Sequence, residues 1–188
     1  MPDWHNAPVD TWAADSGDET VRLLIVGLAP GLKGANRTGR PFTGDYAGDL
    51  LYKTLLKFVF AEGTYDRHAD DGLKLVNCAI TNSVRCVPPE NKPTSQEINT
   101  CRPYLETTIR RFDNLRAIVT LGKIAHDSTI RALGGKPSAI PFGHARLQAV
   151  ADYSLISSYH CSRYNTNTGR LTEEMFEKVF HLAQKAIL

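Results

Sequence analysis

The sequence predicts an α/β protein, a three-layer αβα sandwich around a central, mainly parallel four-stranded sheet. Four short apolar runs are bounded by glycine or polar residues, which is typical of buried strands. Segments with apolar residues at helical spacing lie between and after them, and strands that alternate with helices form parallel sheets covered on both faces. The predicted strands are 22–27, 73–81, 115–122 and 154–160, and the predicted helices are 48–63, 96–112, 123–135 and 172–188.

The length and composition fit one domain. A chain of 188 residues can bury a substantial core. We expect residues 1–20, which are polar and acidic, to form an irregular arm, and residues 21–188 to form a single domain. No apolar run approaches the roughly 20 residues that span a membrane, and the start has no apolar signal core. We therefore expect a cytoplasmic protein, a monomer, without a membrane partner.

The first half of the chain supplies two strands and two helices. The run from Leu23 to Val26 is too short for an independent helix and ends at glycine, so it predicts a strand. After a long polar loop, the spacing of Leu51, Leu55 and Phe58 predicts a helix that stops near Gly63. The apolar stretch 73–81 predicts a second strand. Prolines rule out regular structure in the loop 82–94, and Thr94 or Ser95 can cap the next helix.

The second half repeats this pattern. The run 115–122 predicts a strand, and the following helix stops at Gly134 and Gly135. Residues 136–150 are irregular, with room for an extra strand. The run 154–160 predicts the last strand, and Thr172 can cap the final helix.

Polar loops follow the first, second and fourth of these strands. In a parallel sheet the carboxyl ends of the strands lie at one edge, which is where open α/β sheets bind their ligands. In the first loop, Lys33, Arg37 and Arg40 could bind phosphates, or they could form a solvated basic loop. Neither of the glycine-rich phosphate-binding fingerprints follows the first strand.

Asn82 and His160 are the polar residues closest to two strand ends. An amide can both donate to and accept from a base edge, although an Asx-turn at the strand end explains Asn82 equally well. His160 could be a general acid or electrophile, or a structural hydrogen-bonded histidine. The order of residues matches no serine-protease-type triad.

The joint order of the loops is more specific than any one of them. The stretches GLAPG at 27–31, NRTGRPFTGD at 36–45, TNSVRCVPPENKPT at 81–94 and SYHCSRYNTNTGRLT at 158–172 resemble the uracil-DNA glycosylase superfamily. The sequence is most similar to the family 5 type, with the iron–sulfur family 4 type next. The resemblance covers most of the chain from about Val21 onward.

This resemblance implies an enzyme that flips uracil out of double- or single-stranded DNA and hydrolyses its N-glycosidic bond, leaving an abasic site. It implies that Phe42 stacks on uracil, Asn82 reads its Watson–Crick edge and His160 stabilises the departing base. The implied substrate-binding residues are Gly27, Leu28, Ala29, Pro30, Gly31, Phe42 and Asn82. The implied DNA-contacting residues are Arg37, Arg40, Lys92, Ser162, Arg163, Tyr164 and Asn165, with Tyr164 or Arg163 as the wedge.

Two residues are candidates for positioning the catalytic water. Many members of the superfamily carry a carboxylate where this chain has Ala29. Asn36 and Asp45 remain as polar candidates in the same loop. We expect Asn36 to hold the water, while Asp45 is either catalytic or the cap of the following helix. A pocket without the acid at Ala29 also predicts activity on hypoxanthine or xanthine.

The cysteines bear on a cofactor. Cys78, Cys86, Cys101 and Cys161 are expected to be thiols in a cytosolic chain. Cys86 and Cys101 match two of the four ligands that families 4 and 5 use for a 4Fe–4S cluster, and two thiolates cannot hold one. We expect no cofactor and no metal, unless an N-terminal segment with the other ligands is missing from the sequence.

Two other functions are compatible with this fold. The first is a non-catalytic module that binds damaged bases in DNA. The second is a nucleotide-binding hydrolase, which the absence of a phosphate motif disfavours.

Overall fold

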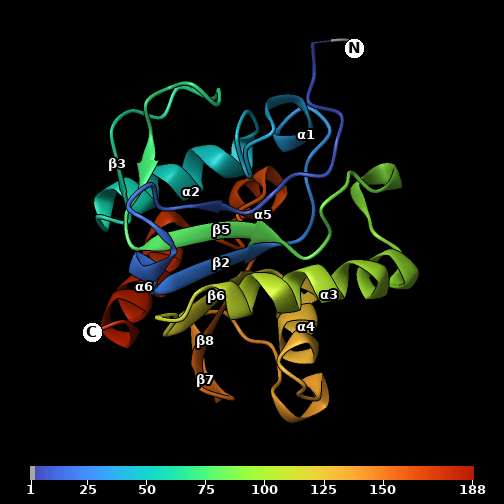
Figure 1. Cartoon of the computed structure of the whole chain (residues 1–188), viewed down its shortest axis with the longest axis vertical. Helices are drawn as coiled ribbons and strands as arrows, with labels where there is room; N and C mark the ends of the chain where they lie inside the picture. The colour runs from blue at the N-terminus through green and yellow to red at the C-terminus, as the bar shows by residue number, and fades with distance from the viewer. Residues whose placement is uncertain (1–2) are drawn as a thin grey trace.

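The computed structural model describes residues 3–188 and has a sheet at its centre. The strands lie in the order β1-β5-β2-β6-β8-β7 (Figure 1). The four central strands are parallel, while the two edge strands are antiparallel to their neighbours. The parallel strands are β5 (Cys78–Asn82), β2 (Leu23–Gly27), β6 (Ala117–Leu121) and β8 (Tyr153–Ser158).

The predicted fold class is confirmed. The central sheet has six strands, whereas the sequence predicted four. The edge strand β7 (Arg146–Val150) occupies the segment in which the sequence left room for a strand. The other edge strand, β1 (Trp12–Ala13), lies in the arm that was expected to be irregular. Two residues carry too little periodicity to mark a strand, so this element has no sequence signature.

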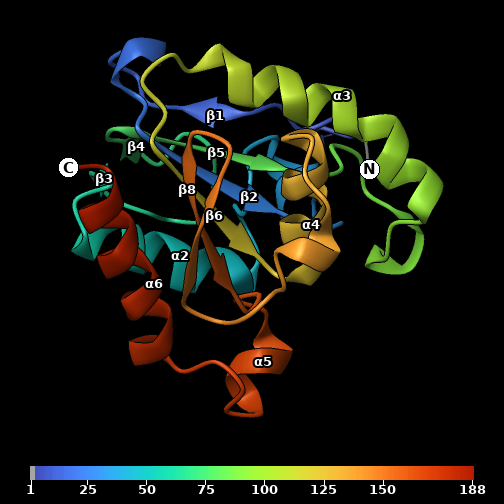
Figure 2. The ribbon, with the colours of Figure 1, turned by 90° about the horizontal axis from the view of Figure 1, so that it is seen from below.

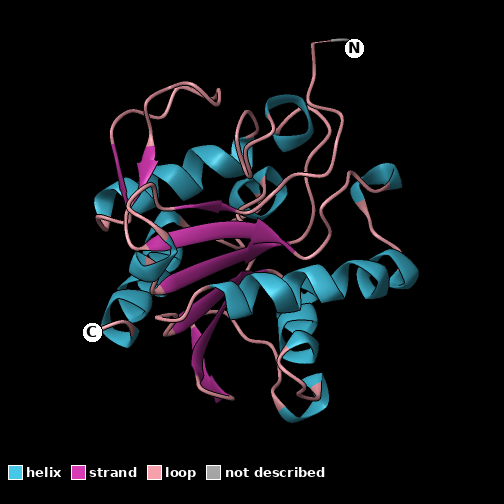
Figure 3. Ribbon diagram, in the orientation of Figure 1, coloured by secondary structure: helices cyan, strands magenta, loops and turns pink. Residues whose placement is uncertain are grey.

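Helices cover both faces of the sheet (Figures 1 and 2). One layer contains α2 (Tyr46–Lys57) and α6 (Glu173–Ala186), and the other contains α3 (Ser95–Arg111) and α4 (Lys123–Ala132). Two short helices, α1 (Ala35–Thr38) and α5 (Arg163–Asn167), interrupt the loops after β2 and β8 (Figure 3). The arrangement is the three-layer sandwich that alternating strands and helices predict.

Three long helices begin at residues whose side chains accept a hydrogen bond from the backbone of the first turn. Asp45 caps α2, Thr94 caps α3 in a reciprocal capping box with Glu97, and Thr172 caps α6. Such caps satisfy N–H groups that have no partner within the helix. They fix where each helix starts and therefore where the preceding loop ends.

The predicted strand 73–81 is divided in the structure. Asn77 has a positive φ of 54°, which no strand residue adopts, and it separates β4 (Lys74–Leu75) from β5. The short strand β4 pairs with β3 (Ala61–Glu62) in a separate two-stranded sheet.

Within residues 3–188, none of the helices combines the length and the apolar composition that crossing a membrane requires.

Candidate functional site

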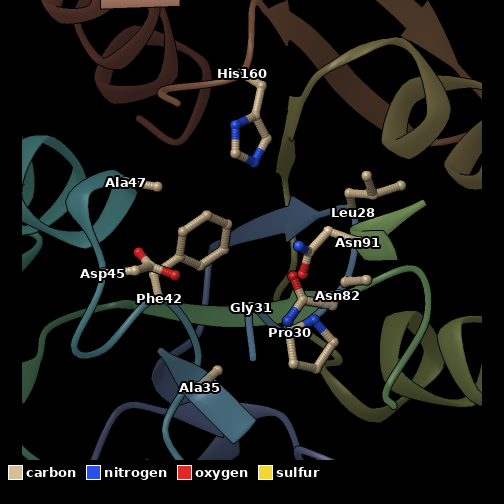
Figure 4. Close-up of a pocket in the computed structure, with 11 residues that line it drawn as sticks. Leu28, Pro30, Gly31, Ala35, Phe42, Asp45, Ala47, Asn82, Asn91 and His160 are labelled. Carbon is tan, nitrogen blue, oxygen red and sulfur yellow. The ribbon is translucent and has the colours of Figure 1, made fainter. Parts of the chain in front are cut away.

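A cavity of about 180 Å³ opens at the carboxyl ends of the parallel strands (Figure 4). Its walls come from the loop after β2, the end of β5, the loop before α3, and His160, which lies two residues after the end of β8. Parallel sheets place ligand sites at this edge. The lining residues are Leu28, Ala29, Pro30, Gly31, Ala35, Phe42, Asp45, Ala47, Asn82, Asn91 and His160.

Asn82 reaches the cavity because it is the last residue of β5. The parallel register pairs it with Gly27, the last residue of β2. Its side chain is buried, and its Oδ1 has no hydrogen-bond partner in the described structure. A buried oxygen that lacks a partner costs free energy unless a ligand supplies a donor. Asn82 is therefore ready to bind an N–H group inside the cavity.

Gly27 leaves room for two of the side chains that form the site. A Cβ atom at this position would lie 2.4 Å from Asn82 Oδ1 and 2.5 Å from Phe42 Cζ. Only a hydrogen atom fits between these groups. Phe42 is itself held with a positive φ of 54°, an uncommon conformation for a bulky residue. The local backbone strain thus directs an aromatic ring into the cavity.

Asp45 caps a helix and also lines the cavity. Its Oδ1 accepts a hydrogen bond of 3.1 Å from the backbone N–H of Gly48, and this bond caps α2. The carboxylate also lines the cavity, close enough to Gly34 that a Cβ there would lie 2.4 Å from Oδ2. Burial raises the pKa of Asp45 above its ordinary value of 3.8, although hydrogen bonds from the backbone oppose this.

His160 forms the opposite wall of the cavity. Burial lowers the pKa of its imidazole to about 4, so the ring is neutral at physiological pH. The rings of His160 and Phe42 are stacked with centroids 6.2 Å apart. The His160 carbonyl accepts a hydrogen bond of 2.8 Å from Asn165 Nδ2. A neutral imidazole in a desolvated pocket can donate one hydrogen bond to a substrate oxygen.

Comparison with known protein families shows to which family the chain belongs. The family model described as the uracil DNA glycosylase superfamily matches residues 14–184. The chain belongs to this superfamily. A type-5 uracil-DNA glycosylase of Thermus thermophilus is 42% identical to it over 170 residues, which are 90% of this chain and 77% of the relative.

Two further relatives place the chain within the superfamily. A type-5 uracil-DNA glycosylase of Mycobacterium tuberculosis is 42% identical over 188 residues, covering 98% of this chain and 68% of the relative. A type-4 uracil-DNA glycosylase of Sulfurisphaera tokodaii is 31% identical over 176 residues, covering 89% and 72%. The similarity is thus greater to the type-5 than to the type-4 enzymes, as the motifs predicted.

Asn36, the expected water-holding residue of this superfamily member, lies outside the cavity lining. Its Nδ2 donates a hydrogen bond of 3.1 Å to Asn6 Oδ1, and its carbonyl accepts one from the Asn6 N–H. The α1 turn presents Ala35 to the cavity instead. Asn36 thus joins α1 to Asn6 of the arm, whereas Asp45 lines the cavity.

Arg40 does not have the position expected for a DNA contact. Its guanidinium is buried, donates two hydrogen bonds of 2.8 Å to the Asp71 carboxylate and lies 4.6 Å from the Trp12 ring centroid. Because this bidentate ion pair neutralises the guanidinium, Arg40 is not available to bind a DNA phosphate. Burial alone would raise the pKa of Asp71, but hydrogen bonds from Arg40 and the backbone outweigh it and hold that pKa at about 2.

The other basic and aromatic residues expected at DNA lie in α1, in the loop before α3 and in the loop after β8. Arg37, Lys92, Arg163 and Tyr164 are exposed, and 72% of the surface of Tyr164 is accessible. The Arg163 guanidinium lies 5.2 Å from the Tyr46 ring centroid. Ser162 caps α5, and Asn165 uses its amide nitrogen to hold the His160 carbonyl, so both have structural contacts as well.

Asn91 is a cavity residue that sequence reasoning missed. It lies in the loop before α3, and both it and Glu90 have positive φ values, 57° and 55°. Figure 4 draws it with Asn82 among the residues that line the cavity. Asparagine tolerates the left-handed conformation better than most residues, which is the one signal that could have singled it out.

Cys86 and Cys101 line a shallow surface hollow next to the start of α3. Cys86 is exposed and Cys101 is half-buried. Across residues 3–188, no group of three or more histidine, cysteine or acidic side chains could hold a metal. A four-thiolate iron–sulfur cluster needs two ligands more than these two cysteines supply.

Proposed function

We propose that this protein is a monofunctional uracil-DNA glycosylase of DNA base excision repair. The observation that carries the proposal is the convergence of Phe42, Asn82, Asp45 and a neutral His160 on one cavity. Membership of the superfamily supports it, and so do relatives named type-5 uracil-DNA glycosylases. The substrate is DNA that contains uracil, and the products are the free base and an abasic site.

Recognition of the flipped base uses Phe42 and Asn82. The ring of Phe42 offers a face on which a pyrimidine can stack. The unpaired Oδ1 of Asn82 accepts the N3–H of uracil, and its amide nitrogen donates to the O4 carbonyl. Cytosine presents no donor at N3, so it would leave the Asn82 oxygen without a partner. The buried amide thus selects uracil over the normal base.

His160 stabilises the departing base. The bond between sugar C1′ and uracil N1 breaks with its electron pair leaving on the base, so negative charge develops on N1 and the O2 carbonyl. A neutral imidazole donates a hydrogen bond to O2 without a charged group having to be buried beforehand. Such preorganised donors stabilise a transition state more than the ground state.

Asp45 places the water and balances the positive charge on the sugar. One carboxylate oxygen is used by the cap of α2, and the carboxylate faces the cavity. It accepts the proton of the attacking water as oxygen bonds to C1′. Its charge also stabilises the oxocarbenium-like sugar. This role needs no carboxylate at the position of Ala29.

The DNA backbone is held by the exposed residues near the cavity. Arg37 and Lys92 supply positive charge, and Ser162 supplies a hydroxyl at the start of α5. Tyr164, exposed on α5, fills the space that the flipped uracil leaves in the base stack, next to Arg163. Contacts of this kind position the enzyme without reading sequence.

The test is cleavage of single- and double-stranded oligonucleotides that carry one uracil, followed by alkaline scission of abasic sites. We expect cleavage by the wild type and loss of cleavage by His160→Ala and Asn82→Ala. Binding to uracil DNA without cleavage would instead favour the non-catalytic damaged-base module. Thermal stabilisation by free nucleotides, without DNA cleavage, would favour the nucleotide hydrolase.

A second proposal concerns substrate range. Ala29 lines the cavity with a small side chain where a carboxylate would occupy space and carry charge. We infer that deaminated purines, hypoxanthine and xanthine, are also accepted. Duplexes that carry inosine or xanthosine test this directly, and no cleavage of either would contradict it.

A further inference from the structure

His144 contacts the catalytic loop from outside the cavity. It lies between η3 (Pro137–Ala139) and β7. Its Nδ1 accepts a hydrogen bond of 3.2 Å from the backbone N–H of Tyr159, the residue before His160. Its Nε2 lies 3.1 Å from the carbonyl of Met175 in α6. The ring thus joins helix α6 to the peptide that enters the catalytic histidine.

These two partners determine the protonation state of His144. A backbone N–H can only donate, so Nδ1 carries no proton, and a carbonyl can only accept, so Nε2 carries one. The ring is therefore the neutral Nε2–H tautomer. Burial lowers the pKa of His144, the Met175 carbonyl raises it and Lys178 on α6 lowers it.

The aromatic contacts of Tyr159 strengthen this link. The rings of His144 and Tyr159 are stacked, with centroids 4.9 Å apart and planes 17° from parallel. The Arg170 guanidinium lies 4.8 Å from the centroid of the Tyr159 ring. Stacking and cation–π contacts of this kind restrict the ring more than burial alone.

The backbone next to His144 is bent in a way that costs energy. Ala145 has a positive φ of 53°, and its N–H donates a hydrogen bond of 2.8 Å to the Ser157 carbonyl of β8. A non-glycine residue in this conformation persists only where its surroundings impose it, and such residues gather at functional sites. Here the bend brings the imidazole of His144 to the Tyr159 peptide.

We propose that His144 is a positioning residue that holds the His160 loop in its catalytic conformation through the hydrogen bond from the Tyr159 N–H. Within the described structure, the imidazole of His160 has no hydrogen bond of its own. Its place depends on the peptides on either side, where Tyr159 N–H binds His144 and the His160 carbonyl binds Asn165. The inference rests on the role of His160 in the proposed function.

Three substitutions separate the parts of this contact. In His144→Asn the amide oxygen can take the place of Nδ1 and still accept from Tyr159. In His144→Gln the amide nitrogen can take the place of Nε2 and still donate to Met175, but the bond to Tyr159 is lost. His144→Phe keeps only the stacking. His181→Asn, at an exposed histidine of α6, is the matched control.

The measurements are the single-turnover rate of uracil release at saturating enzyme and the dissociation constant for uracil DNA. We expect the Gln and Phe variants to lower the rate between about ten- and a hundredfold, because displaced catalytic groups cost this much, with DNA binding unchanged. The Asn variant should recover most of the rate, and the control should match the wild type.

Rates of the Phe and Gln variants equal to that of the wild type would overturn the proposal, as would an Asn variant as slow as Phe. If the variants fold poorly, the nitrogen chemical shifts of His144 in the wild type decide, since a proton on Nδ1 contradicts the assigned contact. His160→Ala is measured alongside. Retained activity in that variant would refute the role of His160 itself, whereas its loss with unaffected His144 variants refutes only this inference.

Discussion

The rings of Phe42 and His160 face each other across the cavity, with centroids 6.2 Å apart and planes 30° from parallel. Phe42 comes from the loop after the first parallel strand, and His160 from the loop after the last. A base that stacks on the face of Phe42 within the cavity therefore lies next to the imidazole of His160. In the proposed function, Phe42 binds the base through its face and His160 stabilises the charge that develops on the base oxygen.

Asp45→Asn should separate catalysis from capping. Asparagine caps helices as well as aspartate, so the thermal midpoint should change little. The single-turnover rate should fall about 10²- to 10³-fold, because the charge on the carboxylate is lost. In the wild type, the rate should fall as the pH drops through the raised pKa of Asp45, because protonation neutralises the carboxylate. If the Asn variant kept the full wild-type rate, this would contradict a catalytic role of the Asp45 carboxylate.

His160 should remain neutral over the working range of the enzyme. Its pKa of about 4 places the imidazolium form well below neutral pH, so no loss of rate between pH 6 and 8 should come from this residue. The Cε1 proton resonance of His160, assigned by comparison with His160→Ala, gives the titration midpoint by NMR. A midpoint near the ordinary value of about 6.5 would contradict the neutral donor.

Gly27→Ala should damage the pocket without removing any polar group. The new methyl would lie 2.4 Å from Asn82 Oδ1 and 2.5 Å from Phe42 Cζ, so both side chains must move. We expect a loss of stability of about 1–3 kcal/mol and a rate at least about 100-fold lower. Gly143→Ala is the control, since the atom nearest to its new Cβ, Arg146 Cδ, would lie 3.4 Å away. A Gly27 variant with normal activity would show that the pocket adapts.

Asp71→Asn should change the acid stability of the protein. The pKa of Asp71 is about 2 in the folded state, below its ordinary 3.8, so its ionised form stabilises the fold above pH 3.8. This contribution, about 2 kcal/mol at neutral pH, is lost as the pH falls from 3.8 towards 2. The variant should unfold at lower denaturant concentration at pH 7, with the difference shrinking below pH 3.8. Asp70→Asn, at an exposed neighbour, should resemble the wild type at both pH values.

The sequence predicted best the structural elements that are marked by residues adjacent in the chain. The four parallel strands were found because buried parallel strands are short continuous apolar runs. The carboxyl ends of these strands lie at one edge of a parallel sheet, and this predicts that Asn82 and His160 lie at that edge. The cap at Asp45 was one of two alternatives, because an acidic residue just before a helical pattern is typical of an N-cap.

The features it missed depend on residues that are distant in the chain. Arg40 was expected at DNA since a basic residue in a glycine-rich loop usually faces solvent. Its partner Asp71 is 31 positions away, and no local pattern links the two. Asn36 is the expected water-holding residue because it aligns with a polar position near the catalytic water in related families, and that role stays a prediction. No local pattern shows that the turn of α1 brings Ala35, not Asn36, to the cavity lining. Asn91 enters the cavity through two left-handed residues that sequence does not mark.

The pairing of β1 with β5 has a consequence for the solubility of the protein. Trp12 and Ala13 occupy the outer hydrogen-bonding positions of β5 opposite Ile80 and Ala79. Without them, β5 would be a bare edge of apolar residues, and such edges recruit strands from other molecules into aggregates. The arm therefore shields the sheet from intermolecular pairing. A shortened chain that begins after Ala13 would expose this edge during expression and concentration.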